Sequence, residues 1–235
     1  MRNSNNYVII FAVIVTVVSA ILLAAAATLL KPYQDANLLK EKQQNILKVV
    51  GKTAPDDYKS FDKLITSLVV NEAGEEVSGV NALSIDLALQ KRIQLKDPNY
   101  KLNYPLYVYT DDAGKKTYIL QLAGTGLWGP IWGYLALDED GNTVKQALFD
   151  HKGETPGLGA EINTAGFQDQ FTNKKIFNEQ GEFVSVAVEK GKHEASDLHK
   201  VDAISGGTIT SNGVSKMLAD DIKFYLTYIQ KQKKS

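Results

Sequence analysis

The chain has no cysteine among its 235 residues. It therefore cannot form disulfides, attack a substrate with a thiolate, or hold a cysteine-ligated iron–sulfur cluster or haem. If this chain takes part in redox chemistry, its electrons must reside on an organic cofactor. The lack of disulfides is compatible with either side of a bacterial membrane and does not choose a compartment.

A surplus of positive charge is also missing. The chain carries 26 Lys and Arg against 27 Asp and Glu, which gives a net charge of -1. Nucleic-acid-binding domains normally show a basic surplus gathered in one patch. We therefore expect no nucleic-acid partner.

Patterns typical of metal sites, hydrolases and dinucleotide-binding folds are absent or incomplete. His151, His193 and His199 lie without a Cys or a close acidic pair that would complete a metal-binding spacing. No Gly-x-Ser-x-Gly nucleophile turn occurs. Residues 124–129 read G-x-G-x-x-G, but Pro130 and a strand-like run follow instead of the helix that binds a pyrophosphate. The sequence predicts no metal site and no catalytic residue. It predicts a glycine-rich bend at residues 124–129.

One long apolar run lies near the N-terminus. Residues 7–30 contain no charged side chain, and about 36 Å of helix from such a run crosses a hydrocarbon core of about 30 Å. We expect a transmembrane helix after a short tail, 1–6. The alternative is a signal peptide cleaved near the alanines at 24–27, although signal peptides have shorter apolar regions. Arg2 and Lys31 flank the run, so charge encodes no clear orientation.

The rest of the chain predicts a juxtamembrane helical segment, 31–60, and one soluble α+β domain, 61–235. Asp/Gly-rich turns between β-rich runs indicate antiparallel hairpins. A closing helix has a buried stripe that only Asp221 interrupts. The expected helices are 33–50, 56–65 and 210–230, and the expected strands are 68–70, 76–80, 106–110, 116–122, 131–137, 143–149 and 183–188.

The segment ETPGLG at 154–159 has the composition of a tight turn. Pro156 and Gly157 suit the central positions of a type II turn. Glu154 and Thr155 add a carboxylate and a hydroxyl beside the apolar Leu158. Taken alone, the segment is either part of a binding site or an ordinary loop.

The segment DAISGGT at 202–208 comes directly before the closing helix. Thr208 is therefore expected at or beside that helix's N-terminus, where unpaired amides and the positive end of the dipole favour a phosphate. The alternative is that Ser205, Thr208, Thr210 and Ser211 only cap the helix.

Residues 202–208 resemble the flavinylation motif D-x-x-(S/T)-G-A-T, in which a flavin transferase joins FMN to threonine through a phosphoester. Most of the chain resembles the C subunit of the sodium-translocating NADH:quinone reductase family. The related G subunit of the Rnf complex shares the anchor, the Thr-Pro-Gly-Leu-Gly turn and the attachment motif, and it remains an alternative, as does a non-redox anchored binding module. The segments that carry the resemblance are 34–37, 42–47, 126–128, 154–159 and 205–214.

The resemblance implies that Thr208 carries a covalent FMN. It also implies that Asp202, Ser205, Gly206 and Gly207 form the segment that the transferase recognises, with Gly207 in place of the motif's alanine. The implied flavin-ring neighbours and remaining cofactor-binding residues are Leu127, Trp128, Glu154, Thr155, Gly157, Leu158, Ile209 and Thr210.

The partners and the location also follow only from the resemblance. It implies a complex with subunits A, B, D, E and F, in which this chain passes electrons from an intramembrane iron centre towards a flavin on the B subunit. A flavin transferase would act during maturation, and the apolar helix would lie in the lipid bilayer. Residues 31–235 would then face the periplasm from a bacterial inner membrane.

Overall fold

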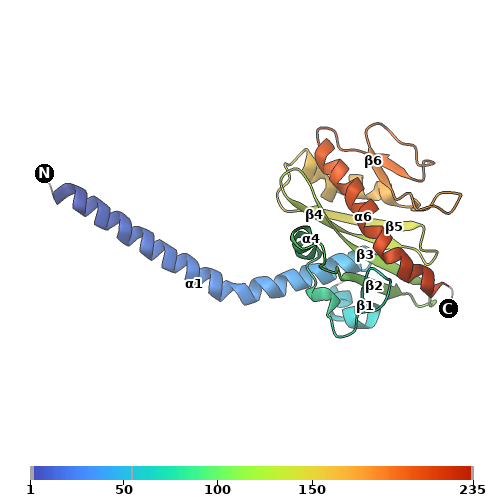
Figure 1. Cartoon of the computed structure of the whole chain (residues 1–235), viewed down its shortest axis with the longest axis horizontal. Helices are drawn as coiled ribbons and strands as arrows, with labels where there is room; N and C mark the ends of the chain where they lie inside the picture. The colour runs from blue at the N-terminus through green and yellow to red at the C-terminus, as the bar shows by residue number, and fades with distance from the viewer. Residues whose placement is uncertain (1–2, 54, 234–235) are drawn as a thin grey trace. The chain divides into compact units, whose positions relative to one another are not determined.

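The computed structural model describes residues 3–53 and 55–233 (Figure 1). The chain separates into two compact units, Met1–Lys42 and Gln43–Ser235. Arg2, one of the charges that flank the apolar run, lies outside the described residues.

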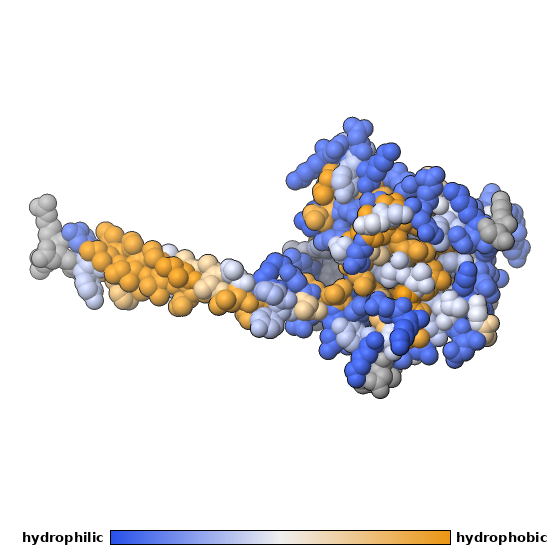
Figure 2. Space-filling model, turned by 90° about the horizontal axis from the view of Figure 1, so that it is seen from below, coloured by the Kyte–Doolittle hydropathy of each residue, from blue (hydrophilic) through white to orange (hydrophobic). Residues whose placement is uncertain are grey.

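Helix α1 (Asn3–Lys48) forms the described part of the first unit, and its residues 43–48 belong to the second unit. By length and composition α1 is a candidate to cross a membrane, and Figure 2 shows apolar side chains along its first half. The sequence predicted two helices separated at Pro32, whereas α1 continues through this residue. Proline removes one backbone hydrogen bond, but its fixed φ is compatible with a helix.

The second unit is built on a five-stranded antiparallel sheet whose strands follow one another in chain order. The two predicted hairpins are confirmed, and their turns place Gly114 and Gly141 at φ of 80° and 56°. Such positive φ angles favour glycine. The strands are β1 (Ile65–Val70), β2 (Tyr104–Thr110), β3 (Lys116–Thr125), β4 (Pro130–Leu137) and β5 (Val144–His151).

Helices cover both faces of the sheet. The closing helix α6 (Thr208–Gln232) lies diagonally across one face (Figure 1), where it buries its apolar stripe against alternate residues of β2–β5. The end of α1, α3 (Phe61–Leu64) and the 3-10 turn η1 (Ala82–Ser84) cover the other face. The sheet therefore has two hydrophobic cores, as its alternating side chains require.

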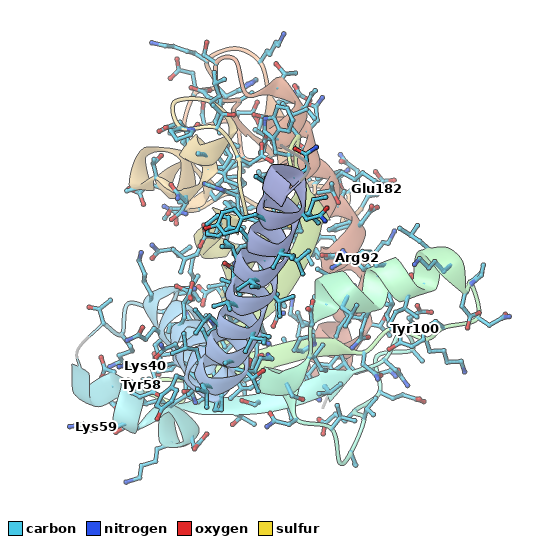
Figure 3. All side chains as sticks on the ribbon, turned by 90° about the vertical axis from the view of Figure 1, so that its left-hand side faces the viewer. Lys40, Tyr58, Lys59, Arg92, Tyr100 and Glu182 are labelled. Atoms are coloured by element: carbon cyan, nitrogen blue, oxygen red, sulfur yellow. The ribbon has the colours of Figure 1, made fainter. Side chains whose placement is uncertain are left out.

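Several elements differ from the sequence prediction. The predicted strand 76–80 forms only a single bridge, between Glu76 and Val70, because Gly79 turns the chain away with φ of 78°. The predicted helix 56–65 is two short helices, α2 (Pro55–Lys59) and α3, and its last residue starts β1. Helix α4 (Leu87–Lys96) had no predicted counterpart. It starts where the Asp86 side chain accepts a hydrogen bond from the Leu89 amide at 2.8 Å, and Arg92 lies on its exposed side (Figure 3).

The region after β5 consists of short elements. The predicted strand 183–188 is reduced to β6 (Ala187–Glu189), which pairs in parallel with β7. The remaining elements are η2 (Gly159–Asn163), α5 (Ala165–Gln168), η3 (Asp169–Phe171) and β7 (Lys200–Asp202).

Side chains replace a missing neighbour strand at the end of β3. The pairing of β2 with β3 ends at Leu120, so the next residues of β3 have one open edge. There the fully buried Asp221 accepts a hydrogen bond from the Ala123 amide at 2.8 Å, and Lys91 bonds both the Ala123 carbonyl and Asp221. The Tyr225 hydroxyl lies 2.6 Å from the Gln121 carbonyl. The polar interruption in the α6 stripe is therefore a buried contact.

Candidate functional site

The glycine-rich bend, the 154–159 turn and the N-terminus of α6 meet at the Glu154 carboxylate. Its Oε1 accepts a hydrogen bond from the Trp128 amide at 2.8 Å, and its Oε2 accepts one from the Thr210 hydroxyl at 2.6 Å. Only 5% of Glu154 is exposed. A buried carboxylate is tolerated when several donors bond it. Glu154 therefore fixes the bend against the helix.

The electrostatic environment of Glu154 favours its charged form. Burial of the carboxyl raises its pKa, but the bonds from the Thr210 hydroxyl and from the Trp128 and Leu127 amides outweigh burial. The pKa of Glu154 is therefore held below its ordinary value. The Glu154 amide in turn donates to His151 Nδ1 at 3.1 Å, so His151 supports the same residue from the end of β5.

Two glycines make this close packing possible. A Cβ on Gly126 would lie 2.6 Å from Glu154 Oε1, and a Cβ on Gly159 would lie 2.4 Å from Glu154 Oε2. No side chain of any size fits at either position without moving the carboxylate. These glycines are therefore required by the close approach of the backbone to Glu154.

The 154–159 segment forms the tight turn that its composition predicted. The Leu158 amide donates to the Thr155 carbonyl at 3.1 Å, and Gly157 has a φ of 76°, as a type II turn requires. The Gly157 amide donates to Glu161 Oε1 at 2.9 Å. The turn leaves Thr155 and Leu158 exposed beside the bend.

A second turn leads into α6. The Gly207 amide donates to the Ile204 carbonyl at 3.0 Å, and Gly206 has a φ of 74°. A Cβ on Gly206 would lie 2.6 Å from Leu158 Cδ2, so this turn packs against the first one. Ser211 stabilises it by accepting a hydrogen bond from the Ile204 amide at 3.1 Å.

Thr208 is the first residue of α6 and is half-buried. The preceding Gly207 has no side chain to cap the helix, and the first turn contains no acidic residue. The first amides of a helix have no intrahelical acceptor and lie at the positive end of its dipole. This helix end therefore offers donors for a phosphate at the position of the Thr208 side chain.

Exposed apolar side chains surround this helix end. Each is between 41% and 68% exposed, which is unusual for large apolar residues so close together. They come from the bend, from the type II turn and from the first turn of α6. We call them the apolar rim: Leu127, Trp128, Leu158 and Ile209.

The structure places Asp202 apart from this rim, in strand β7. Its Oδ1 accepts a hydrogen bond from the His193 amide at 2.6 Å, and its own amide donates to Gln170 Oε1 at 2.8 Å. The Asp202 carboxylate thus holds the segment before β7. The exposed Ser205 lies closer to Thr208, in the turn that precedes α6.

Sequence reasoning missed several residues that build the site. His151 was considered only as a metal ligand, although its position three residues before Glu154 was a possible signal. The sequence suggests Ser211 only as a helix cap and Gly159 only as part of a turn, because their roles depend on contacts between distant segments. Gln170 gave no sequence signal at all.

These features fit FMN, which has a phosphate at one end and a planar, largely apolar ring at the other. The open amides at the start of α6 suit the phosphate. The apolar rim suits a ring, since ligand sites combine apolar walls with a few polar groups. The close packing of Leu158 against Gly206 brings both parts of the site together.

Comparison with known proteins identifies an FMN-binding domain in this chain. A profile of the FMN-binding domain family matches residues 126–223. The match begins in the glycine-rich bend and contains the type II turn, Thr208 and most of α6.

The similarity to characterised proteins extends over most of the chain. The C subunit of Na(+)-translocating NADH-quinone reductase from Neisseria meningitidis serogroup B is 36% identical over 206 residues, which cover 81% of this chain and 79% of that protein. The protein of the same name from Haemophilus ducreyi is 33% identical over 201 residues, which cover 79% of this chain and 77% of that protein.

Solved structures show the same relationship. The crystal structure of this C subunit from Parabacteroides distasonis has a TM-score of 0.72 and 39% identity, and the match covers 85% of this chain and 96% of that one. NqrC of Shewanella oneidensis has a TM-score of 0.74 and 26% identity, with 85% and 100% covered. The chain therefore belongs to the family formed by the C subunit of Na(+)-translocating NADH-quinone reductase.

Proposed function

We propose that this chain is the electron-carrying subunit of a sodium-pumping NADH:quinone reductase complex and holds FMN through a phosphoester on Thr208. The observation that carries the proposal is the position of Thr208. Its hydroxyl belongs to the first residue of an uncapped helix, beside an apolar rim fixed by Glu154. Family membership supports the assignment to a redox complex.

The chain's own residues bind and orient the cofactor. The first amides of α6 donate to the phosphate and compensate its negative charge. The apolar rim receives the ring, and Glu154 keeps the bend and the helix in register. FMN, when bound, supplies reversible electron transfer, and a covalent link prevents its loss during turnover.

The attachment itself requires a second enzyme. Both Glu154 oxygens already accept hydrogen bonds, from the Trp128 amide and the Thr210 hydroxyl, and the lowered pKa of Glu154 makes it a weak base. We propose that a flavin transferase recognises the segment around Ser205, Gly206 and Gly207 and forms the phosphoester. The open surface of this turn gives the transferase access, since Ser205 and Gly206 are exposed.

The complex and the membrane complete the proposal. A candidate membrane-spanning helix and membership of a membrane-complex family fit a membrane-anchored protein. We propose that α1 crosses a bacterial inner membrane once, with the folded domain on the periplasmic side. There the flavin would accept electrons from an iron centre in the membrane subunits and pass them towards the flavin on the B subunit.

Mass spectrometry tests the attachment. The full chain is co-expressed with a flavin transferase, and we expect a mass increase of about 438 Da, FMN less one water, on the peptide that contains Thr208. Thr208→Ala should lose this increase, and Thr208→Ser should keep part of it because the hydroxyl remains. An unmodified wild-type chain under these conditions would favour a non-redox module in which Thr208 only starts a helix. Flavin retained on Thr208→Ala would move the site, with Thr210 as the next hydroxyl.

The orientation has a separate test. Because the chain has no cysteine, a single Asp112→Cys substitution in the exposed turn between β2 and β3 can report its compartment. We expect intact cells with a permeable outer membrane to label this cysteine with a membrane-impermeant maleimide. Labelling only after the inner membrane is lysed would place the domain in the cytoplasm.

A further inference from the structure

A cavity of about 190 Å³ lies on the opposite face of the sheet from α6. Its floor is formed by Tyr134 and Leu148, which belong to the core on that face. Other walls come from the end of α1 and from the short elements after β5. Gly133 and Phe149 also line it, and the remaining lining residues are Asn45, Lys48, Trp132, Asp150, Asn163 and Gln168.

Trp132 and Asp150 form the centre of one wall. They are direct partners in the pairing of β4 with β5, so their side chains lie next to each other on one face of the sheet. Within the described residues, Asp150 forms no ion pair. Its carboxylate accepts a single hydrogen bond, from the His151 amide at 2.8 Å. An aromatic face beside a free carboxylate is a binding surface for a cation.

Gln168 contributes a second acceptor. Its side chain is 6% exposed, and its Nε2 donates to the carbonyls of Phe149 at 2.9 Å and Ile162 at 3.2 Å. Because both partners are carbonyls, the orientation of the amide is fixed and Oε1 is the group left over. No partner bonds this oxygen in the part of the chain that the structure describes. Because this oxygen is not among the polar atoms sealed from solvent without a partner, a donor that enters the cavity can reach it.

We infer that this cavity receives the guanidinium group of an arginine from a partner polypeptide. A guanidinium is planar, stacks on a tryptophan face and carries five N–H donors, which suits Trp132, Asp150 and Gln168 together. The volume is large enough for several waters, which leaves room for the guanidinium while its aliphatic stem stays at the mouth. Asn45, Asn163 and Lys48 are then placed to donate to main-chain carbonyls of the same polypeptide.

The inference rests on the proposed place of the chain in a complex of several subunits, which supplies the partner polypeptide. It concerns a surface separate from the flavin site. Ile131 and Phe149, the neighbours of Trp132 and Asp150 along the strands, point into the α6 core. The partner would therefore contact the reverse side of the strands that lead into the flavin site.

The chemistry of the cavity is tested on the full chain in detergent micelles. The probe is Nα-acetyl-arginine amide, and the matched control is the citrulline analogue, which has the same shape without the charge. The chain has two tryptophans, so NMR of ¹⁵N-labelled indoles follows Trp132 with Trp128 as an internal reference. We expect saturable shifts of the Trp132 signal with the arginine probe only.

Two substitutions sharpen this test. Asp150→Asn keeps the acceptor for the His151 amide but removes the charge, and it should weaken binding of the arginine probe by at least about tenfold. Lys48→Gln removes the nearby positive charge and should not weaken binding of the arginine probe. Equal responses to arginine and citrulline would overturn the inference. The inference would also be overturned if Nα-acetyl-glutamate amide bound more tightly than the arginine probe and Lys48→Gln abolished that binding. Such a result would describe an anion site.

The partner is tested in the assembled complex. Asn163 is exposed at the mouth of the cavity, and Asn163→Cys in the cysteine-free chain carries a benzophenone maleimide. Irradiation should cross-link it to another subunit near an arginine, and replacing that arginine with glutamine should abolish the product. Asp112→Cys is the control on a different surface. An assembled complex without this cross-link would overturn the inference alone, whereas a chain that never assembles with other subunits would also overturn the proposed function.

Discussion

The hydrogen bond from Thr210 to Glu154 holds the flavin site together and can be removed with one substitution. Thr210→Val keeps the shape of the side chain but deletes the hydroxyl that donates to Glu154 Oε2 at 2.6 Å. Thr210 is 1% exposed and Glu154 is 5% exposed, so water cannot replace the lost donor without opening the site. The substitution leaves a buried carboxylate with one donor fewer.

The expected loss follows from the type of bond. A hydrogen bond to a charged group contributes about 1.5–3 kcal/mol to stability, and we expect Thr210→Val to lower the free energy of unfolding by about 2 kcal/mol. For a domain of this size each kcal/mol changes the melting temperature by about 2–4 °C. The melting temperature should therefore fall by about 4–8 °C.

The pH dependence identifies the carboxylate as the cause. The pKa of Glu154 is held below its ordinary value, so its contribution to stability is complete above the unfolded pKa of about 4.3. The contribution disappears as pH falls from there through the lower pKa of the folded state. The difference between wild type and Thr210→Val should accordingly be large at pH 7 and should shrink below about pH 4.

Thermal and urea unfolding of the full chain in detergent measure both effects. Thr164→Val is the matched control, because the Thr164 hydroxyl donates at 2.8 Å to the neutral carbonyl of Glu161. This control should lower the free energy of unfolding by only about 1 kcal/mol, and this loss should not shrink as pH falls below about 4. Equal losses for the two valine variants at pH 7, or a Thr210→Val loss that does not change with pH, would refute the reasoning.

Three further substitutions test the packing of the site and its support. Gly159→Ala should lower the free energy of unfolding by at least about 2 kcal/mol, because its methyl would overlap the Glu154 carboxylate. Its control is Gly157→Ala, which lies in open space at φ of 76° and should lower this free energy by only about 1 kcal/mol. Equal losses in urea unfolding would contradict this reasoning. Asp221→Asn removes the charge of the fully buried carboxylate that pairs with the partly exposed Lys91 and should lower the free energy of unfolding by about 1.5–3 kcal/mol; a loss below about 1 kcal/mol in the same assay would contradict a stabilising ion pair. Gly207→Ala restores the alanine of the flavinylation motif. This variant should still carry covalent FMN when measured by mass spectrometry. Its free energy of unfolding should fall by about 1 kcal/mol, because the new methyl would lie 2.9 Å from a neighbouring isoleucine. Loss of the flavin would show that glycine is required here.

Local sequence signals predicted the parts of this fold that depend on neighbouring residues. The turns at Gly114 and Gly141 defined two hairpins, because Asp and Gly favour the same local conformation wherever they occur. The type II turn around Gly157 and the start of α6 near Thr208 were predicted for the same reason. The motif segments therefore gave the outline of the candidate site.

Contacts between distant segments were not predictable from one sequence. Thr210 contacts Glu154, which is 56 residues away in the sequence, and Lys91 contacts Asp221, which is 130 residues away. Asp221 interrupts an apolar stripe, and no local pattern distinguishes a buried, paired acid from an exposed one. Helix α4 was missed because its mean composition is polar and its outer face is exposed, which weakens the helical periodicity.

The open edge of β3 has a consequence for solubility. An uncovered strand edge is a template on which a second chain can add its own strand, which leads to aggregation. Lys91 and Asp221 occupy both backbone groups of Ala123, and Tyr225 covers the carbonyl of Gln121. They close the edge with side chains that cannot extend the sheet. The helices α4 and α6 therefore protect the strand that leads into the flavin site from pairing with another molecule.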